Sequence, residues 1–324
     1  MMGVLSYAVF FTSVASILAI AVLGLNLQWG NTGLFNGGVV AFFGAGAYGT
    51  LILGGTPQPD HLGGFGLAYP LALAGGAIAA GLLAWVVGLL TLRLRHDYLA
   101  IATFGIAVTF ENIMRNAEGL SGGAKGFRGF ERPLEQWLGS GFAYNVTFLC
   151  FVLVILVAVY GFLQRLVRSP FGRVLRAIRE DEDASRSLGK SPSRMRLTAF
   201  ITGSVMMGIS GGLYATFYAF ISPQDVLPTL TFQIWAMLIV GGAGNNRGAV
   251  MGAFLVWGAW TASGWILSRF APVDLQVYTG SIQYVLIGAV IVGMLLWRPE
   301  GLFPERLVVS QSGYPGLQNK KEGV

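Results

Sequence analysis

Side chains that could carry acid–base or metal chemistry are few in this sequence, and they do not cluster. The two histidines, His61 and His96, are too far apart in sequence to suggest a metal site. The single cysteine, Cys150, lies within an apolar run, where we interpret it as a small hydrophobe. A nucleophile paired with a base is not visible along the chain. We therefore expect no catalytic residue, no metal site and no resident cofactor, and we predict that the chain is not an enzyme.

Two glycine patterns bear on nucleotide binding. Gly44, Gly46 and Gly49 match the Gly-x-Gly-x-x-Gly pattern of dinucleotide-binding folds, but that fingerprint requires a preceding strand and a βαβ unit. Here the glycines lie within a long apolar segment, which favours close packing of helices. The chain also lacks the Gly-rich phosphate loop that ends in Gly-Lys-Ser or Gly-Lys-Thr. It is therefore not expected to bind and hydrolyse ATP in that way.

A carboxylate within an apolar segment is the most unusual charged group of the sequence. Glu111 lies in such a segment, where an ionised carboxylate costs about 2.5 kcal/mol or more unless it finds a partner or water. With Asn112 and Arg115 beside it, Glu111 predicts either a local ion pair at the external end of a helix or a polar lining at the mouth of a permeation path. Three further polar positions are candidates for the lining: Asn26, Asn36 and Gln233.

Composition places these residues in a membrane protein. Of the 324 residues, 54% are hydrophobic and 11% are charged, whereas ordinary soluble domains carry roughly 25% charged residues. A soluble domain needs more polar surface than this chain supplies. The formal charge of +6 is concentrated in one segment, so it indicates membrane orientation rather than nucleic-acid binding, which we do not expect.

The apolar segments predict an all-α, polytopic transmembrane helix bundle that forms a single domain over residues 1–324. A helix needs about 20 apolar residues to cross the hydrocarbon layer. Such segments run over 4–25, 33–53, 68–92, 98–115, 144–164, 197–220, 249–268 and 280–297. A ninth segment, 231–242, is too short to span the bilayer unless it is tilted or re-entrant. We therefore expect eight or nine spans.

The positions of lysine and arginine predict the orientation of this bundle. The segment 164–196 contains nine of them, whereas the loop 116–144 has three basic and three acidic residues. Because short cytoplasmic loops are enriched in lysine and arginine, we expect the loop 165–196 to be cytoplasmic and the loop 116–144 to be external. The tail 298–324 then also falls in the cytoplasm, provided that the segment 231–242 crosses the membrane.

The basic segment itself has the signals of two short helices. Pro170 favours a helix start, and Gly189 with Pro192 favours a stop. The acidic run 180–183 suits the N-terminus of a second helix, because carboxylates complement the helix dipole there. Apolar residues share one face of the first helix: Val174, Leu175 and Ile178. The segment is either a solvated loop that only fixes topology or a rigid element that docks into a cleft on a soluble partner.

Several motifs resemble those of a known transporter family. Asp183-Ala184-Ser185, followed after three residues by Gly189, resembles the Glu-Ala-Ala…Gly coupling loop of ATP-binding-cassette (ABC) importer permeases. The string from Gly172 to Glu182 closely resembles the LivM-type subunit of the branched-chain amino acid permease family. Further matches follow in the family's order: Gly24-Leu25-Asn26-Leu27, Ala41 to Tyr48, Arg95 to Thr103, Leu120 to Gly126, Gly241-Gly242-Ala243-Gly244, and Arg298-Pro299-Glu300-Gly301-Leu302.

This resemblance implies a permease subunit that moves branched-chain or other amino acids by alternating access in the bacterial inner membrane. It also implies the partners: a second homologous permease, a periplasmic solute-binding protein and two cytoplasmic ABC ATPase subunits, which would bind the ATP and magnesium. Seven residues are then expected to couple the chain to the ATPases: Arg176, Arg179, Glu180, Asp183, Ala184, Ser185 and Gly189.

The sequence departs from the family pattern at two places. Asp183 stands for the expected Glu and Ser185 for the second Ala, changes that keep charge or small size. The stretch Leu34-Phe35-Asn36-Gly37-Gly38 replaces a Ser-Leu-Gly-His-like string, which bears on solute choice and leaves urea or short amides as alternative solutes. An ion-coupled secondary transporter is a second hypothesis, but it requires an intramembrane ion site in spans that are nearly free of charge.

Overall fold

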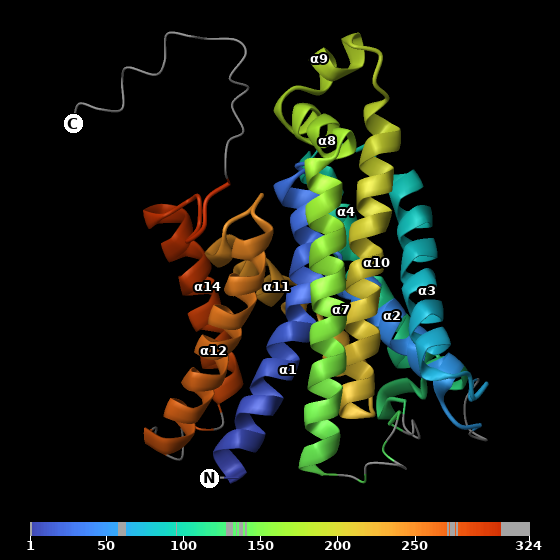
Figure 1. Ribbon diagram of the computed structural model, residues 1–324, viewed down its shortest axis with the longest axis vertical. Helices are drawn as coiled ribbons and strands as arrows, with labels where there is room; N and C mark the ends of the chain where they lie inside the picture. Colours follow the sequence, from blue (N-terminus) through green and yellow to red (C-terminus); the bar gives the residue numbers. More distant parts are fainter. Residues whose placement is uncertain are drawn as a thin grey trace.

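A computed structural model of the chain describes residues 2–57, 63–94, 96–127, 141–270 and 278–305, together with positions 132, 133, 135, 139, 272 and 276. Over these residues the chain forms a bundle of helices (Figure 1). The described part contains no strand, and a single isolated bridge pairs Phe127 with Ile221. The prediction of an all-α bundle is confirmed.

The long helices follow the predicted segments. They are α1 (Met2–Leu25), α2 (Val39–Gly54), α3 (Tyr69–Thr91), α4 (His96–Asn116), α7 (Phe142–Arg168), α10 (Pro192–Tyr218), α11 (Pro228–Gly241), α12 (Asn246–Phe270) and α14 (Thr279–Trp297). Short elements join them: η1 (Asn26–Gly30), α5 (Glu118–Ser121), η2 (Gly123–Lys125), α8 (Pro170–Glu180), α9 (Glu182–Ser187) and η3 (Pro223–Val226).

Each of the nine apolar segments thus contains a helix. Six helices of the described part are long and apolar enough to cross a membrane, namely α1 with η1, α3, α7, α10, α12 and α14. The helices α2 and α11 are apolar but shorter, and α4 is long but less apolar. The chain is therefore a multi-pass membrane protein, and the predicted eight or nine spans fit roughly.

The second helix starts later than predicted. We expected it from residue 33, but residues 31–38 form turns and irregular backbone, and α2 begins at Val39. Gly33 has φ +73°, in the left-handed region that ends a helix. The backbone N–H of Gly37 donates to Thr103 Oγ1 over 2.9 Å, and that of Gly38 donates to Asn36 Oδ1 over 2.8 Å. Side chains therefore satisfy the backbone just before α2, and carbonyl oxygens of η1 accept from Gly33 and Leu34.

The centre of the bundle depends on close approach of helix backbones. The helix α10 packs against α1, α2 and α3. A Cβ atom added at Gly211 of α10 would overlap the carbonyl oxygen of Phe43 in α2, and one added at Gly46 would overlap the backbone of Gly208. Such contacts need glycine and drive association where lipid removes the hydrophobic force between helices. The close helix packing predicted for the segment that contains Gly44, Gly46 and Gly49 is thus confirmed at Gly46.

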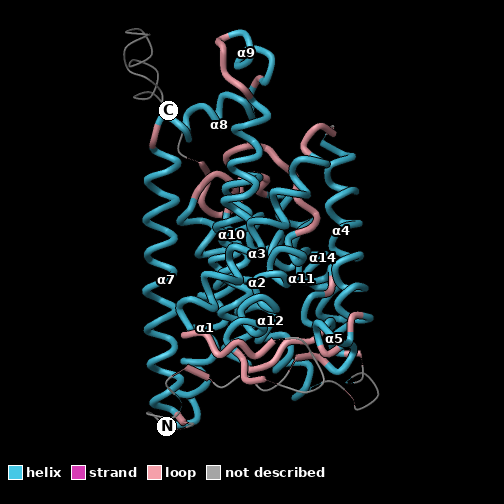
Figure 2. Tube along the Cα trace, turned by 90° about the vertical axis from the view of Figure 1, so that its right-hand side faces the viewer, coloured by secondary structure: helices cyan, strands magenta, loops and turns pink. Residues whose placement is uncertain are grey.

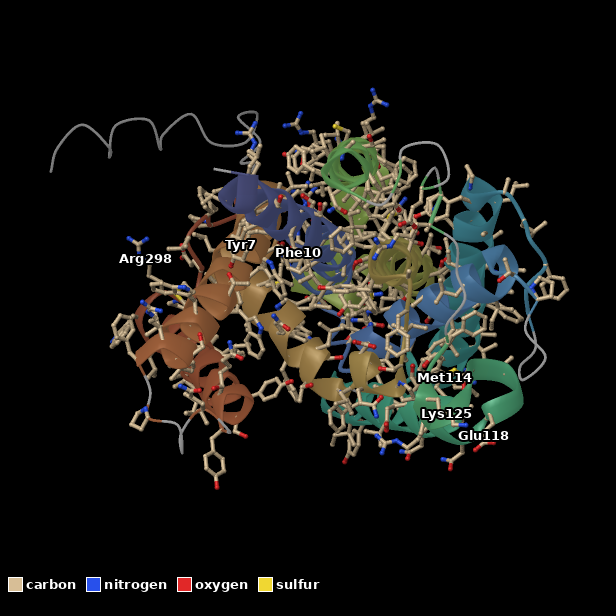
Figure 3. All side chains as sticks on the ribbon, turned by 90° about the horizontal axis from the view of Figure 1, so that it is seen from below. Tyr7, Phe10, Met114, Glu118, Lys125 and Arg298 are labelled. Atoms are coloured by element: carbon tan, nitrogen blue, oxygen red, sulfur yellow. The ribbon has the colours of Figure 1, made fainter. Side chains whose placement is uncertain are left out.

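The helices at the periphery differ in the surface that they expose. Large apolar side chains cover the outer face of α14, where Val285, Leu296 and Trp297 are exposed, as lipid contact requires. The outer face of α4 is mixed: it exposes large apolar side chains such as Ile101 and Ile113, and also polar residues, which are described below. In Figure 3, which views the bundle from one end, α4 with the labelled Met114 lies at a different edge from α7.

The two ends of the bundle are distinct. The helices α8 and α9 protrude at the end where α1, α7 and α14 finish, while the N-terminus lies at the other end (Figures 1 and 2). We call α8 and α9 together the elbow, and the end that carries them the elbow end. The described part of the tail, residues 298–305, also lies at the elbow end, and residues 306–324 lie outside the described residues.

Candidate functional site

The elbow forms the two helices that its sequence predicts. Pro170 occupies the first turn of α8, where its missing N–H costs nothing. Asp181 is the N-cap of α9, and its side-chain carboxylate accepts from the backbone N–H of Ala184 over 2.9 Å. Gly189 follows α9 with φ +73°, a conformation that strains any residue with a side chain. Local capping therefore fixes both boundaries.

The apolar face of α8 packs on the protein's own bundle. Leu175 is fully buried and Ile178 is 1% exposed. Elements in contact with α8 include α7 and α10. The hypothesis that this apolar face inserts into a partner's cleft is therefore wrong for Leu175 and Ile178. Burial of apolar area favours this arrangement, because the face would otherwise lie in water.

The exposed part of the elbow is α9 and the turn after it. The side chain of Asp183 is 89% exposed, and Leu188 is 79% exposed. Ala184 and Gly189 are exposed beside them. We call these four residues the tip. Leu188, the C-cap of α9, is the large apolar side chain of this exposed surface.

A single arginine connects α8 to the interior of the bundle. One guanidinium nitrogen of Arg179, Nη1, donates to the backbone carbonyl of Gly30 at the end of η1. The other, Nη2, pairs with the Glu305 carboxylate over 2.8 Å, with the two side chains 25% and 20% exposed. We call these contacts the Arg179 latch. It joins the elbow to the end of α1 and to the segment after α14.

A second ion pair connects α9 to α10. Glu182 forms an ion pair with Arg196 over 2.5 Å, and the Arg196 side chain is only 13% exposed. On its other side Glu182 pairs with Arg186 over 3.0 Å, and Arg186 also reaches Asp183 over 3.0 Å. The short helix α9 is thus held to the start of a long central helix.

The seven residues predicted to couple to ATPases therefore face in two directions. Asp183, Ala184 and Gly189 belong to the tip, and Glu180 is exposed at the end of α8. Arg179 and Ser185 are turned toward the bundle: Ser185 is 4% exposed, and Arg179 forms the latch. Arg176 is half-buried and borders a groove between α7 and α12. Their role in coupling stays a prediction.

The interior next to the latch holds a network of amides. Asn26 is fully buried in the π-helical turn η1, and its Nδ2 donates to Asn246 Oδ1 over 2.8 Å. Asn26 Oδ1 accepts from the backbone N–H of Gly244 over 2.8 Å. The amides of Asn246 and Gln164 lie 3.0 Å apart. Asn26 therefore connects α1 with the loop before α12 and, through Asn246, with α7.

A second set of amide contacts closes the break before α2. Gln28 donates through Nε2 to the carbonyl of Phe200 over 2.8 Å and accepts through Oε1 from Asn36 Nδ2 over 2.8 Å. The carbonyl of Asn36 accepts from Trp235 Nε1 over 2.9 Å. We call Asn26, Gln28, Asn36 and Asn246 the polar core. Trp29, Phe35 and Trp235 pack beside it, with ring centroids 4.3–5.5 Å apart.

The structure places the four predicted lining residues in different surroundings. Asn26 and Asn36 both belong to the polar core, fully buried and hydrogen-bonded. Glu111 forms an ion pair with Arg115 one turn along α4, and its side chain is 8% exposed. Gln233 is 7% exposed, and its Nε2 has no hydrogen-bond partner among the described residues. Their role as path lining stays a prediction.

Sequence reasoning missed a polar stripe on α4. Thr109, Asn112 and Asn116 are exposed, and the side chains bond only to carbonyl oxygens four residues earlier in their own helix, over 2.8–2.9 Å. Their spacing of three and four residues, in a helix of lower mean hydropathy, was the signal that could have revealed them. Amides are costly on a lipid-facing surface, so this face suits another protein or a water-filled path. Gln28 and Glu305 were also missed, because their partners are distant in sequence.

Metal and cofactor groups have no evident place in the described residues. Within them, no group of three or more His, Cys, Asp or Glu side chains is arranged to hold a metal ion. His61 lies outside the described residues. What the described residues do show at the elbow end is an exposed tip, the Arg179 latch and a buried network of amides.

Comparison with known proteins places this geometry in context. Residues 7–295 match the family model described as branched-chain amino acid transport system / permease component. The high-affinity branched-chain amino acid transport system permease protein LivM of Escherichia coli K12 is 33% identical over 304 residues, and its Salmonella typhimurium counterpart is 32% identical over 303 residues. Each alignment covers 87% of this chain and 66% of the relative.

An archaeal relative is covered over nearly its whole length. The probable branched-chain amino acid transport permease protein LivM of Methanocaldococcus jannaschii is 27% identical over 329 residues, which is 89% of this chain and 90% of the relative. The chain thus spans slightly less than two thirds of the two bacterial relatives and most of the archaeal one.

Replacing Asn26 tests whether the polar core holds the bundle together. We expect Asn26→Leu to lower the free energy of unfolding by about 1–3 kcal/mol for each buried partner left unsatisfied. The measurement is the thermal unfolding midpoint in a neutral detergent. The matched control is Asn112→Leu, because Asn112 is exposed and its side chain bonds only to Val108 of its own helix. Equal midpoints for the two variants would contradict a structural role for Asn26.

Proposed function

The chain belongs to the family of branched-chain amino acid transport permease components, and from this premise we propose that it is the membrane-spanning subunit of an ATP-driven importer for branched-chain or other amino acids. The observation that carries the proposal is the family match over residues 7–295, which includes the elbow and the polar core. In this proposal the chain is not an enzyme. Partner ATPase subunits bind and hydrolyse the ATP, with its magnesium ion.

We further propose that the elbow end faces the cytoplasm across a bacterial inner membrane. The nine lysine and arginine residues of 164–196 support this orientation, because positive charge is enriched in cytoplasmic loops. The helix directions agree: α7 leads into the elbow, and α14 brings the tail to the same end (Figure 1). The external end would then receive solute from a periplasmic binding protein.

The elbow supplies the proposed connection to two ATPases. The tip is the surface that an ATPase would cover, and α8 is the part that would carry the resulting movement into the bundle. The Arg179 latch reaches the end of α1, and the Glu182–Arg196 pair reaches α10. An element held at two points moves with the helices that it touches, as rigid-body switching requires.

The solute path is proposed to lie against a second, homologous permease. The exposed amides of Asn112 and Asn116 support this placement, since a polar face on a membrane helix needs a partner or water. Glu111 would then stand near the external mouth of the path. Asn26, Asn36 and Gln233 would border it in a second conformation, because the described one packs the two asparagines fully. Alternating access requires two such states.

Reconstituted uptake tests the function. We expect leucine to enter proteoliposomes only when this chain is combined with the second permease, both ATPases, ATP and the binding protein. Urea and a short amide serve as alternative solutes, and the ligand of the binding protein decides among the three. Uptake by this chain alone under an ion gradient would contradict the proposal and favour a secondary transporter.

Replacing Leu188 tests the docking role of the tip. We expect Leu188→Asp to weaken association with the ATPase subunits at least about 30-fold, because a charge replaces an apolar contact at the centre of the tip. Association can be measured by titrating the reconstituted permease pair with purified ATPase. The control is Leu120→Asp, another exposed leucine that lies in α5 at the opposite end. Unchanged affinity for Leu188→Asp would exclude the tip as the docking surface.

Replacing Arg179 tests transmission separately from docking. We expect Arg179→Leu to leave ATPase binding and hydrolysis intact but to lower the solute transported per ATP by about 5- to 150-fold, the usual range of coupling between sites. The matched control is Arg194→Leu, because the Arg194 side chain is exposed and outside the described ion pairs. Transport per ATP equal to that of the unmodified protein would rule out transmission through the latch.

A further inference from the structure

A large groove opens at the elbow end between α7 and α12. Its volume is about 1020 Å³, and its floor and rim include residues of α8 and the segment 302–305. Figure 1 shows α7 and α12 on either side of α1, with α8 above α7. The groove is thus bounded by two membrane helices along its length and by the elbow at one end.

Three arginines surround the end of this groove next to the elbow. They are Arg168 at the end of α7, Arg176 on α8 and Arg247 at the start of α12. None of the three forms an ion pair within the described residues. Glu305 also borders the groove, but its carboxylate is already paired with Arg179. The rim therefore carries an uncompensated positive charge.

The walls of the groove change from polar to apolar along both membrane helices. On α7 the polar Arg168 and Gln164 are followed, toward the middle of the helix, by Tyr160 and Leu156. From Arg168 to Leu156 the helix rises about 18 Å. On α12 Arg247 is followed in the same direction by apolar residues, among them Met251. Both walls therefore place positive charge at the end of the helices and apolar surface toward their middle.

We infer that this groove binds an anionic phospholipid, with the phosphate among the three arginines and an acyl chain along α7 and α12. The charge complementarity selects an anion, and the apolar wall selects one with a hydrocarbon chain. A free phosphate would leave the apolar wall uncovered. The groove also lies on α7 and α12, at a different edge from the polar stripe of α4 that is proposed to meet the second permease (Figure 3). The lipid site does not depend on the transported solute.

The site would connect the elbow to the surrounding membrane. Arg176 belongs to α8, three residues before Arg179 of the latch, whereas Arg168 and Arg247 belong to membrane helices. A phosphate held by all three arginines joins α8 to α7 and α12. Occupancy of the groove therefore favours one position of the elbow, which makes the protein sensitive to the anionic lipid content of its membrane.

Lipid retention by the full chain tests this site. The protein is purified in a neutral detergent and titrated with phosphatidylglycerol or phosphatidylcholine, and bound lipid is counted by native mass spectrometry. We expect a preference for phosphatidylglycerol that falls about fivefold for each of Arg168→Gln and Arg247→Gln, because each cation near a lipid headgroup contributes a comparable attraction. Both arginines are exposed, so the folded state should tolerate the changes.

Matched variants distinguish the site from general attraction to positive charge. Arg168→Lys with Arg247→Lys should keep most of the preference, and Arg194→Gln with Arg298→Gln, which changes two exposed arginines outside the groove, should keep all of it. Three outcomes would overturn the inference: no preference for phosphatidylglycerol, an equal loss in the control variants, or displacement by equimolar inorganic phosphate. Displacement by the ATPase subunits would also overturn it, by assigning the groove to a protein.

Discussion

The rest of the structure depends on one requirement, that every backbone N–H and C=O group inside the bilayer finds a partner within the protein. Helices meet this requirement by themselves, but residues 31–38 are not helical and yet are mostly buried. Carbonyl oxygens of η1 accept from Gly33 and Leu34, and the side-chain oxygens of Thr103 and Asn36 accept from Gly37 and Gly38. Each group left unpaired in hydrocarbon would cost several kcal/mol. The amides of the polar core are therefore structural in the first place, and any role in transport is added to that one.

The elbow contacts the bundle next to this break in the helix. Arg179 donates to the carbonyl of Gly30, which is the last residue of the π-helical turn and lies just before the irregular segment. A continuous helix resists change because one rearranged bond disturbs its neighbours. An interrupted helix can move by exchanging a few side-chain hydrogen bonds, and π-helical turns are frequent at functional sites. In the proposed importer, movement of the elbow would therefore reach α1 where its backbone is already interrupted.

The sequence predicted the helices well because apolar length and charge are local properties. Pro170, Asp181 and Gly189 likewise fix the elbow through contacts within a few residues, so its two helices could be predicted. The late start of α2 could not, because it depends on Thr103 in another helix. The direction of the α8 face was also missed, since Leu175 and Ile178 have the same pattern whether a partner or the bundle covers them. Likewise, the sequence identified Asn26 and Asn36 as candidate lining residues, but it could not show that residues distant in sequence satisfy the hydrogen bonds of their side chains.

The division of the elbow into a buried and an exposed helix follows from the stability of short helices. A helix of six residues such as α9 is not stable alone, because the free-energy cost of nucleating a helix exceeds what the hydrogen bonds of a single turn contribute. Here the Asp181 cap, the pairs of Glu182 with Arg186 and Arg196, and the attachment to α8 hold it in place. Its charged residues are thus used for internal contacts, which leaves Leu188 as the large apolar side chain at the tip. A partner that covers Leu188 meets a surface that is already ordered, so little of its binding free energy is lost to ordering the chain.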